Sequence, residues 1–357
     1  MNCHGTVEVQ TCAALARADL AYFVGWEAAI TGEPGAEPDP AGPTIGSLGE
    51  FGLIGEFRSV MPAGPLTSVG IGDDAAVVTA PSGSVVAAVD MMLEGRHFLR
   101  SWSSGQDVGV KAAARGLADI AAMGAVPTAL LVALAAPASL PASWALELAS
   151  GLASEAERAG AGIAGGDTAA AESVLVSVTA LGDLRGLPPV RRSGAGAGDI
   201  VAVCGKLGHS AAGLALLNER LRAPESLVSA HLRPAPLYDA GPEAARLGAT
   251  AMIDTSDGLL ADLGHVAAAS GVAINLSSAA LEDPLLSFRT DSGGSSRSQA
   301  LEWALTGGED HALVATFPRG AALPPRWRVI GTVTGPGEGV TVDGEEYKGS
   351  AGWQHFR

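Results

Sequence analysis

The sequence predicts an α/β or α+β protein with two domains. Strand-like apolar runs and helix-like amphipathic segments alternate in both halves of the chain, as in mixed α/β architectures. The 357 residues are enough for two hydrophobic cores. Because 47% of the residues are hydrophobic and only 17% charged, we expect well-packed cores and not a disordered chain. The 48 glycines and the low aromatic content of 4% favour close packing of helices against sheets.

The first 45 residues are expected to be an extension outside the globular protein. Residues 1–31 carry a faint helical pattern, and residues 31–43 form a linker rich in proline, glycine and acidic residues. Charged residues interrupt the apolar run before this linker, so it fits neither a signal peptide nor a bilayer-spanning helix. We therefore expect a cytoplasmic protein whose globular part begins at Gly46.

The first globular domain is expected to span residues 46–186. A strand is predicted at residues 84–90, where an apolar run ends in an aspartate. A helix is predicted at residues 107–125, and Gly124 and Pro127 are expected to stop it. The remaining elements of this domain are a strand at residues 128–137, a helix at 143–160 and a strand at 173–184.

The second domain is expected to span residues 187–357. Its clearest element is an amphipathic helix at residues 255–271, with an apolar face made of Leu259, Leu260, Leu263 and Val266. Residues 289–299 are expected to form a low-complexity loop. The other predicted elements are strands at residues 200–205, 250–254, 272–276, 311–317 and 326–334 and a helix at 209–221.

The charge balance excludes several classes of partner. Lys and Arg total 22 against 38 Asp and Glu, so the net charge is −16 and no basic stripe is available for nucleic acid or an anionic membrane. The three cysteines, Cys3, Cys12 and Cys204, lie far apart and match no zinc-binding spacing. This is typical of a cytoplasmic, disulfide-free protein.

Two adjacent carboxylates, Asp73 and Asp74, precede a run that we expect to be a buried strand. Like charges this close raise each other's pKa and destabilise the fold unless a cation lies between them. Farther along, Asp119 shares one helix face with Arg115, one turn away, and Lys111, two turns away. Taken alone, that face is best explained as a surface ion pair.

Three other acidic motifs also have ordinary structural explanations when each is taken alone. Asp167 lies in a Gly-Gly-Asp-Thr sequence, which is typical of a turn before a strand. Asp254 is expected at a strand end, with Ser256 or Asp257 as the N-cap of the next helix. Glu309 follows two glycines before another strand.

Taken together, the aspartates indicate one site. They lie at element ends or on one helix face, mostly beside glycine or hydroxyl residues, where ligands bind in α/β folds. Oxygen ligands suit Mg²⁺, and nearby glycines let backbone N–H groups approach phosphate oxygens. The sequence therefore predicts a magnesium–nucleotide site with several ions. The aspartates are Asp73, Asp74, Asp90, Asp119, Asp167, Asp254 and Asp257.

The common nucleotide-binding signatures do not fit. The Gly205-Lys206 pair is followed by Leu207, whereas a P-loop requires serine or threonine there. The glycine-rich stretches at residues 70–75 and 194–198 lead into strands, whereas a dinucleotide fingerprint opens a helix. The His-Arg-Asp signature of protein kinases is missing as well.

Nine motifs occur in a characteristic order between residues 46 and 356: GDDAA, VDMMLEGRHF, KAAARGLADIAAMGAVP, GGDT, RSGAGAGD, HLRPAP, IDTSDGL, GGEDHAL and GWQHF. This set resembles the thiamine-monophosphate kinase family. That family belongs to the ATP-dependent superfamily of aminoimidazole ribonucleotide synthetase and selenophosphate synthetase. The resemblance implies ATP-dependent phosphorylation of thiamine monophosphate to thiamine diphosphate by in-line transfer. It also implies a homodimer in which the N-terminal sheets form a barrel-like interface, and a C-terminal α/β domain.

The resemblance further implies roles for individual residues. Ligands of several Mg²⁺ ions are expected at Asp74, Asp90, Asp119, Asp167, Asp254 and Asp257. ATP contacts are expected at Gly166, Asp167, Arg192 and Ser256, and substrate contacts at His97, Glu309 and Trp353. The residues expected to act in catalysis are Asp119, Asp167 and Arg192. The roles of Asp73 and Lys111 stay open.

The chain departs from the family pattern at a few positions near these residues. Gly116 and Ala118 replace the usual asparagine and serine before Asp119, and His311 replaces a common tyrosine. Two alternatives to the kinase therefore stay open. One is another ATP-dependent enzyme of the superfamily, similar to aminoimidazole ribonucleotide synthetase. The other is a non-catalytic regulator that binds magnesium and nucleotide on the same fold.

Overall fold

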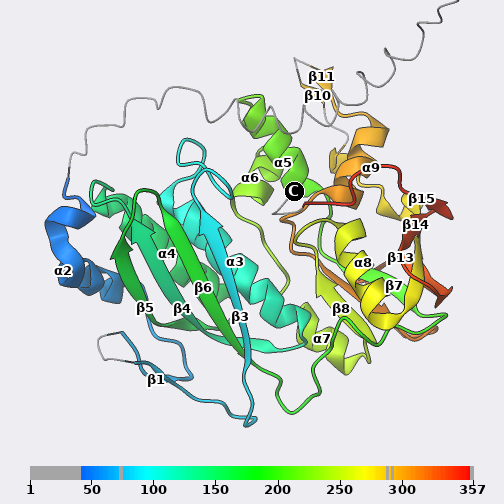
Figure 1. Cartoon of the computed structure of the whole chain (residues 1–357), viewed down its shortest axis with the longest axis horizontal. Coiled ribbons are helices and arrows are strands. Elements are labelled where there is room, and N and C mark those ends of the chain that lie inside the picture. The colour runs from blue at the N-terminus through cyan, green and yellow to red at the C-terminus, as the bar shows by residue number, and fades with distance from the viewer. Residues whose placement is uncertain (1–41, 72–74, 287–288, 291–292, 354–357) are drawn as a thin grey trace, which may run out of the picture.

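The computed structural model describes residues 42–71, 75–286, 289–290 and 293–353. Two mixed α/β halves lie side by side, each built around one large sheet (Figure 1). The alternation of strands and helices predicted for both halves is confirmed. No helix within these ranges is both long enough and apolar enough to cross a membrane.

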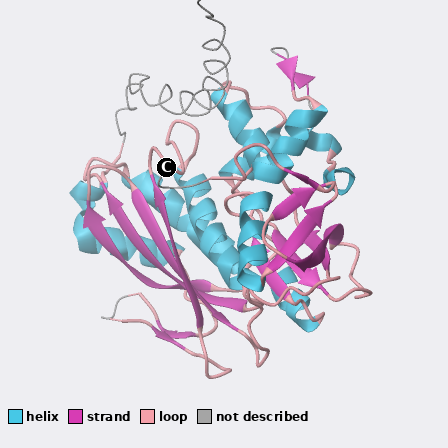
Figure 2. Cartoon of the chain, turned by 45° about the vertical axis from the view of Figure 1, so that its right-hand side comes forward, coloured by secondary structure: helices cyan, strands magenta, loops and turns pink. Residues whose placement is uncertain are grey.

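The N-terminal half contains a four-stranded sheet in the order β3-β6-β4-β5. Only β4 and β5 run parallel, and the crossover between them contains a helix. Helices cover one face of the sheet and leave the other face bare (Figure 2). The bounds are α2 (Ile45–Val60), β1 (Thr67–Val69), β2 (Val77–Val78), β3 (Val86–Leu93), α3 (Gly105–Ala122), β4 (Val126–Ala136), α4 (Ala142–Arg158), β5 (Gly162–Ala170) and β6 (Leu175–Asp183).

The C-terminal half contains a seven-stranded sheet in the order β15-β14-β9-β13-β7-β12-β8. Its strands are β7 (Ile200–Cys204), β8 (Ala251–Asp254), β9 (Val272–Leu276), β12 (Leu313–Phe317), β13 (Arg328–Pro336), β14 (Val340–Val342) and β15 (Glu345–Glu346). Its helices are α5 (His209–Asn218), α6 (Glu225–Leu232), α7 (Ala240–Arg246), α8 (Leu259–Ser270) and α9 (Arg297–Thr306). The predicted apolar face of α8 is confirmed, because all four of its residues are buried.

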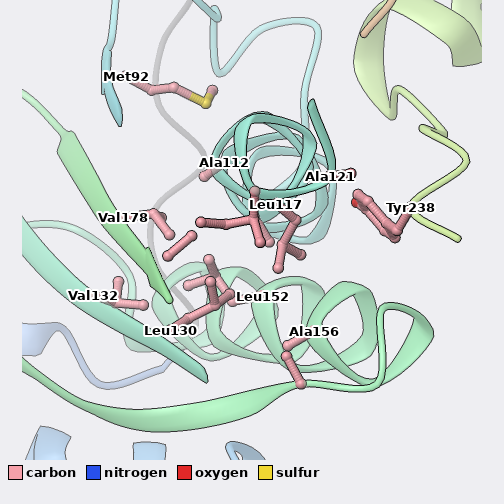
Figure 3. Packing of buried hydrophobic residues seen from close by; sticks show 14 of the residues in the cluster. Met92, Ala112, Leu117, Ala121, Leu130, Val132, Leu152, Ala156, Val178 and Tyr238 are labelled. Carbon is pink, nitrogen blue, oxygen red and sulfur yellow. The ribbon is translucent and has the colours of Figure 1, made fainter. Parts of the chain in front are cut away.

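Helix α3 joins the two halves. It packs against β3, β4 and β6 of its own half and against β8 and β12 of the other half. Leu117 of α3 lies among Val178, Leu130 and Leu152 in this core (Figure 3). The same core includes Phe317 of β12, so one layer of apolar side chains serves both sheets.

The ends of α3 are well defined by the sequence. Ser104 and Asp107 form a reciprocal capping box at its N-terminus, in which each side chain accepts the other's backbone N–H. Gly124 follows the C-terminus with a φ of 76°, which only glycine adopts without cost. The predicted stop at Gly124 is therefore confirmed, whereas Pro127 lies inside β4.

Three other local predictions are wrong. The strand predicted to end at Asp90 continues to Leu93, so Asp90 lies inside β3. The run after Asp74 is not a buried strand, because β2 has two residues and Val77 is 51% exposed. Residues 289–299 are not a simple loop: β10 (Arg289–Thr290) pairs with β11 (Gly293–Gly294), and α9 follows at once.

Helices α3 and α4 approach closely at glycines, and this contact yields a prediction about stability. A Cβ atom at Gly109 would lie 2.1 Å from the Leu148 carbonyl oxygen, which is backbone and cannot rotate away. We expect Gly109→Ala to lower the free energy of unfolding by about 1–3 kcal/mol, measured by urea denaturation. The matched control is Gly264→Ala in α8, where a Cβ meets nothing within 4 Å. That variant should be neutral or slightly more stable, and equal losses in both would contradict the close-contact explanation.

Candidate active site between the two halves

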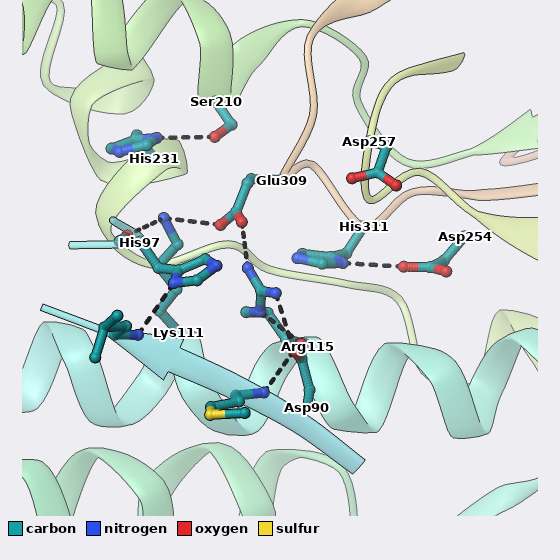
Figure 4. A network of polar contacts seen from close by, with 12 residues as sticks. Asp90, His97, Lys111, Arg115, Ser210, His231, Asp254, Asp257, Glu309 and His311 are labelled. Carbon is teal, nitrogen blue, oxygen red and sulfur yellow. Dashed lines mark hydrogen bonds and ion pairs between the residues drawn. The ribbon is translucent and has the colours of Figure 1, made fainter. Parts of the chain in front are cut away.

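The candidate site is centred on charged side chains from both halves (Figure 4). Arg115 of α3 binds Asp90 of β3 through Nε at 2.6 Å and Nη2 at 3.0 Å, and its Nη1 binds Glu309 of the C-terminal half. Lys111, one turn earlier on α3, lies with its Nζ 2.8 Å from Glu309 Oε2. The predicted surface ion pair on this face is wrong, because the Lys111 side chain is only 3% exposed and Arg115 only 11%.

The loop that carries Glu309 has an unusual backbone. Glu309 and His311 have positive φ angles of 65° and 51°, which cost energy in residues other than glycine. Two hydrogen bonds hold the loop, from Glu309 N to Ser256 O at 2.9 Å and from His311 N to Thr255 O at 2.9 Å. The Asp310 carboxylate accepts two backbone N–H bonds at the start of α5, and burial raises its pKa to about 7. The loop therefore places Glu309 over α3 as part of a rigid framework.

The end of β8 brings two more predicted residues to the same place. Asp254 is buried, and its Oδ2 lies 3.0 Å from Nδ1 of His311. The Asp257 carbonyl accepts a hydrogen bond from Trp353 N at 2.9 Å, which joins the C-terminal segment to the site. Asp254, Asp257, Glu309 and Trp353, predicted from separate motifs, are thus neighbours around one loop. Trp353 is 47% exposed.

The predicted helix cap after β8 is wrong. Neither Ser256 nor Asp257 caps α8, because the N-cap is Gly258 and makes no side-chain bond. Instead, Asp262 Oδ2, one turn into the helix, accepts the N–H groups of Asp257 and Gly258 at 3.2 Å and 3.0 Å. The Asp257 side chain is therefore not required for capping.

The charges in the site are unequally compensated. Burial opposes ionisation of Glu309, but Lys111 and Arg115 hold the pKa of its carboxyl well below the usual range. Burial raises the pKa of Asp119 to about 7, and the charges of Asp254 and Asp90 add to this rise. The site therefore contains carboxylates that repel one another, which is the condition that a bound cation relieves.

The donor atoms fit Mg²⁺ in kind, because carboxylate oxygens are its preferred protein ligands. Asp90, Asp119 and Asp254 are close enough to affect one another's charge. However, no three carboxylate, imidazole or thiolate groups in the described ranges are already arranged to hold a metal ion. Asp73 and Asp74, the first predicted platform, lie outside the described residues.

Two predicted nucleotide contacts lie on the edge strand of the N-terminal sheet. Gly166 and Asp167 are inside β5, so the predicted Gly-Gly-Asp-Thr turn is wrong. Asp167 is exposed and pairs in register with Ala133 of β4. Across Ser177 of β6, Ala133 aligns with Met91 of β3. This row of residues lies on the bare face of the sheet. Asp90, by contrast, faces α3. Three strand spacings, about 14 Å, separate β5 from β3.

Of the remaining predicted residues, one lies beside the ion-pair network and one lies far from it. The His97 carbonyl accepts a bond from Lys111 Nζ at 3.3 Å, and its Nδ1 accepts the Leu93 N–H at 3.0 Å, so His97 borders the ion-pair network. Arg192 is not brought to that network. Its carbonyl accepts the Ser270 hydroxyl at the C-terminal end of α8, about 18 Å along the helix from the site.

Sequence reasoning missed Arg115 and His311 as site residues and left the role of Lys111 open. Taken alone, the face with Lys111 and Arg115 suggests a surface ion pair, although the helix around them is rich in alanine and apolar residues on its other faces. That composition is the signal of a helix buried between layers. His311 was seen only as a departure from the family pattern, and its proximity to Asp254 depends on the antiparallel pairing of β12 with β8.

Comparisons with known proteins give a consistent result. Family models match residues 72–184, as the AIR synthase related protein N-terminal domain, and residues 196–343, as the corresponding C-terminal domain. A thiamine-monophosphate kinase of Mycobacterium tuberculosis H37Rv is 49% identical over 317 residues, 88% of this chain and 93% of the relative. That of Corynebacterium glutamicum is 40% identical over 329 residues, 88% of this chain and 96% of the relative.

Two solved structures have the same fold. The thiamine-monophosphate kinase of Stenotrophomonas maltophilia K279a has a TM-score of 0.72 and 33% identity, covering 83% of this chain and 96% of its own. The structure of AaThiL complexed with AMPPCP and TMP has a TM-score of 0.69 and 34% identity, covering 87% of this chain and 97% of its own.

The raised pKa of Asp119 predicts that its ionised carboxylate lowers the stability of the fold. The pKa rises from 3.8 to about 7 on folding, so the folded protein resists deprotonation, and the ionised carboxylate costs stability above that pH. In EDTA at about pH 8, Asp119→Asn should raise the free energy of unfolding by about 1–3 kcal/mol. The gain should fade as the pH falls from about 7 to about 4 and vanish below about 4, where the carboxyl is protonated in both states. An unchanged or lower stability of the variant at the higher pH would contradict this electrostatic account.

Proposed function

This chain belongs to the thiamine-monophosphate kinase family, and from that premise we propose that it transfers the γ-phosphoryl group of ATP to thiamine monophosphate between its two halves. The observation that carries the proposal is the 49% identity to a curated thiamine-monophosphate kinase over 88% of this chain. The AaThiL complex with AMPPCP and TMP, at 34% identity over 87% of this chain, supports the two substrates.

The reaction needs charge neutralisation more than a base. The acceptor is a phosphate monoester that is mostly dianionic near neutral pH, so its oxygen attacks without losing a proton. Two polyanions must then meet inside a protein whose net charge is −16. Lys111 and Arg115 are the cations that α3 places there. Their role is to lower the electrostatic barrier and to orient phosphate oxygens for in-line attack.

Magnesium supplies the rest of the positive charge and polarises the transferred phosphoryl group when bound. We propose that several ions are held by Asp74, Asp90, Asp119, Asp167, Asp254 and Asp257. The mutual repulsion of Asp119, Asp254 and Asp90 supports this assignment. The nucleotide would be contacted by Gly166, Asp167, Arg192 and Ser256.

The thiamine end of the acceptor carries a positive thiazolium ring. Glu309 is anionic and borders the network, which suits a cationic ring. The half-exposed indole of Trp353 offers a flat surface for stacking, and the half-buried His97 lines the other side of the ion pairs. We propose these three side chains as the acceptor contacts.

A homodimer is part of this proposal. The bare face of the N-terminal sheet exposes Val89 to 68% and Met91 to 52% on β3. Thr179 and Ser177 of β6 lie next to them, and Leu131 and Ala133 of β4 follow as further apolar residues. A second copy packed on this face would bury it in a barrel-like interface. Asp167 projects from the same face, so the nucleotide and metal site would be completed across the interface.

We also propose that the two halves are the two domains of the family, residues 46–186 and 187–357, after an extension of residues 1–45. The end of β6 at Asp183 and the gap between the matched regions, residues 72–184 and 196–343, support this division. A cytoplasmic location suits an enzyme that uses ATP.

The direct test is a coupled assay of the purified protein with ATP, Mg²⁺ and thiamine monophosphate, followed by separation of the thiamine products. Thiamine diphosphate and ADP should appear in equal amounts and only with divalent metal. Asp167→Asn should abolish the product while the melting temperature stays near that of the wild type, because this side chain is exposed in the single chain.

Other outcomes identify the alternatives. ATP and Mg²⁺ binding without product would favour a synthetase relative, for which formylglycinamidine ribonucleotide is the next substrate to test. Binding without turnover of either substrate would favour a regulator. Full activity of Asp167→Asn would contradict the metal assignment.

The dimer is tested by Val89→Asp, which places a charge on the bare face in the middle of the edge strand β3. Light scattering after size-exclusion chromatography should give a dimer for the wild type and a monomer for the variant, with loss of activity. The control is Val329→Asp, an equally apolar side chain that is 47% exposed on β13 of the other sheet. A dimeric and active Val89→Asp would place the interface elsewhere.

A further inference from the structure

Arg115 has two carboxylate partners that the proposed reaction needs for other purposes. It binds Asp90 through two nitrogens and Glu309 through a third. Asp90 is a proposed metal ligand, and Glu309 is the proposed partner of the thiazolium ring. Each carboxylate that turns to another cation leaves Arg115 with part of its charge uncompensated.

A buried guanidinium cannot be left without an anion at small cost. The Arg115 side chain is 11% exposed, so water replaces lost partners poorly. Its neighbour Lys111 is in the same position, because its 3% exposed side chain depends on Glu309 and on the His97 carbonyl. The two cations therefore require an incoming anion whenever Asp90 and Glu309 are occupied.

The acceptor substrate offers the matching charges. Thiamine monophosphate carries a cationic ring and an anionic phosphate, and the network offers an anion, Glu309, beside a cationic pair. The planar fork of arginine binds two oxygens of a phosphate as it binds a carboxylate. Two carboxylates already occupy such positions on Arg115, which defines where phosphate oxygens would lie.

We propose that Arg115 binds the phosphate of the acceptor substrate, and that its ion pairs with Asp90 and Glu309 are exchanged for this phosphate when substrate enters. This inference rests on the proposed function and adds a residue for which the family resemblance implied no role. The donor nucleotide also carries phosphates, but the direct bond to Glu309 favours the acceptor.

The test compares two ligands that differ only in the phosphate. Calorimetric titration of the full chain with Mg²⁺ gives the dissociation constants of thiamine monophosphate, thiamine and AMPPCP for wild type and Arg115→Gln. We expect thiamine monophosphate to bind the variant about 10- to 100-fold more weakly. Thiamine and AMPPCP should change by less than about 3-fold. If thiamine binds too weakly for titration, its inhibition constant against thiamine monophosphate replaces the measurement.

A purely structural role would give a different pattern. Equal weakening of thiamine and its monophosphate would overturn the proposal, and selective weakening of AMPPCP would assign Arg115 to the nucleotide. Arg326→Gln is the matched control, because Arg326 also binds two carboxylates, Asp239 and Glu243, outside the site. It should leave the ratio of the two thiamine constants unchanged.

Two further measurements keep the test decisive. If Arg115→Gln does not unfold cooperatively, Arg115→Lys replaces it, keeping the charge but losing the fork, and should show a smaller, phosphate-selective loss. The proposed function is judged separately. Selective loss of phosphate binding in a protein that forms no thiamine diphosphate would support the Arg115 inference and reject the kinase reaction.

Discussion

The burial of α3 between two sheets is the constraint on which the structure depends. Of its 18 residues, 14 are buried, so most of the helix must be small or apolar. Its charged side chains recur every fourth residue, at Asp107, Lys111, Arg115 and Asp119. A charge in such a position must find a partner. Asp107 binds Arg233, and the two cations bind Asp90 and Glu309, so most of this stripe pairs with groups from other elements.

The same constraint explains what the sequence could and could not predict. Apolar runs identified strands such as β7, β8 and β12, which are buried along nearly their whole length, and a one-sided apolar pattern identified α8. Periodicity cannot show which layer covers a helix, so it could not place Lys111 and Arg115 in a buried network. Strand register was equally out of reach, and Asp167 was placed in a turn although β5 continues through it. The proximity of Asp254 and Glu309 was predictable, because one lies at the end of β8 and the other just before β12, and these strands are neighbours.

The loop around Glu309 shows how backbone geometry serves the site. Gly308 is required there because a Cβ would lie 2.4 Å from the Ser256 carbonyl oxygen. Glu309 and His311 both have positive φ angles. The Glu309 side chain turns to the cations of α3, and the His311 side chain turns to Asp254. One short loop thus positions both the Glu309 carboxylate and the proposed metal ligand Asp254. Loss of its hydrogen bonds to Thr255 and Ser256, which follow β8, would disturb both together.

The shared apolar layer also limits how the enzyme can move. Domains that close around a ligand by a hinge have separate cores and part along a polar seam. Here Phe317 and Met252 of the C-terminal sheet belong to the same core as Leu117 of α3, so swinging the halves apart would expose apolar surface. Substrates are therefore expected to enter and leave by movement of loops and side chains while the two halves keep their relative position. If either half were expressed alone, one side of its hydrophobic core would be exposed to solvent.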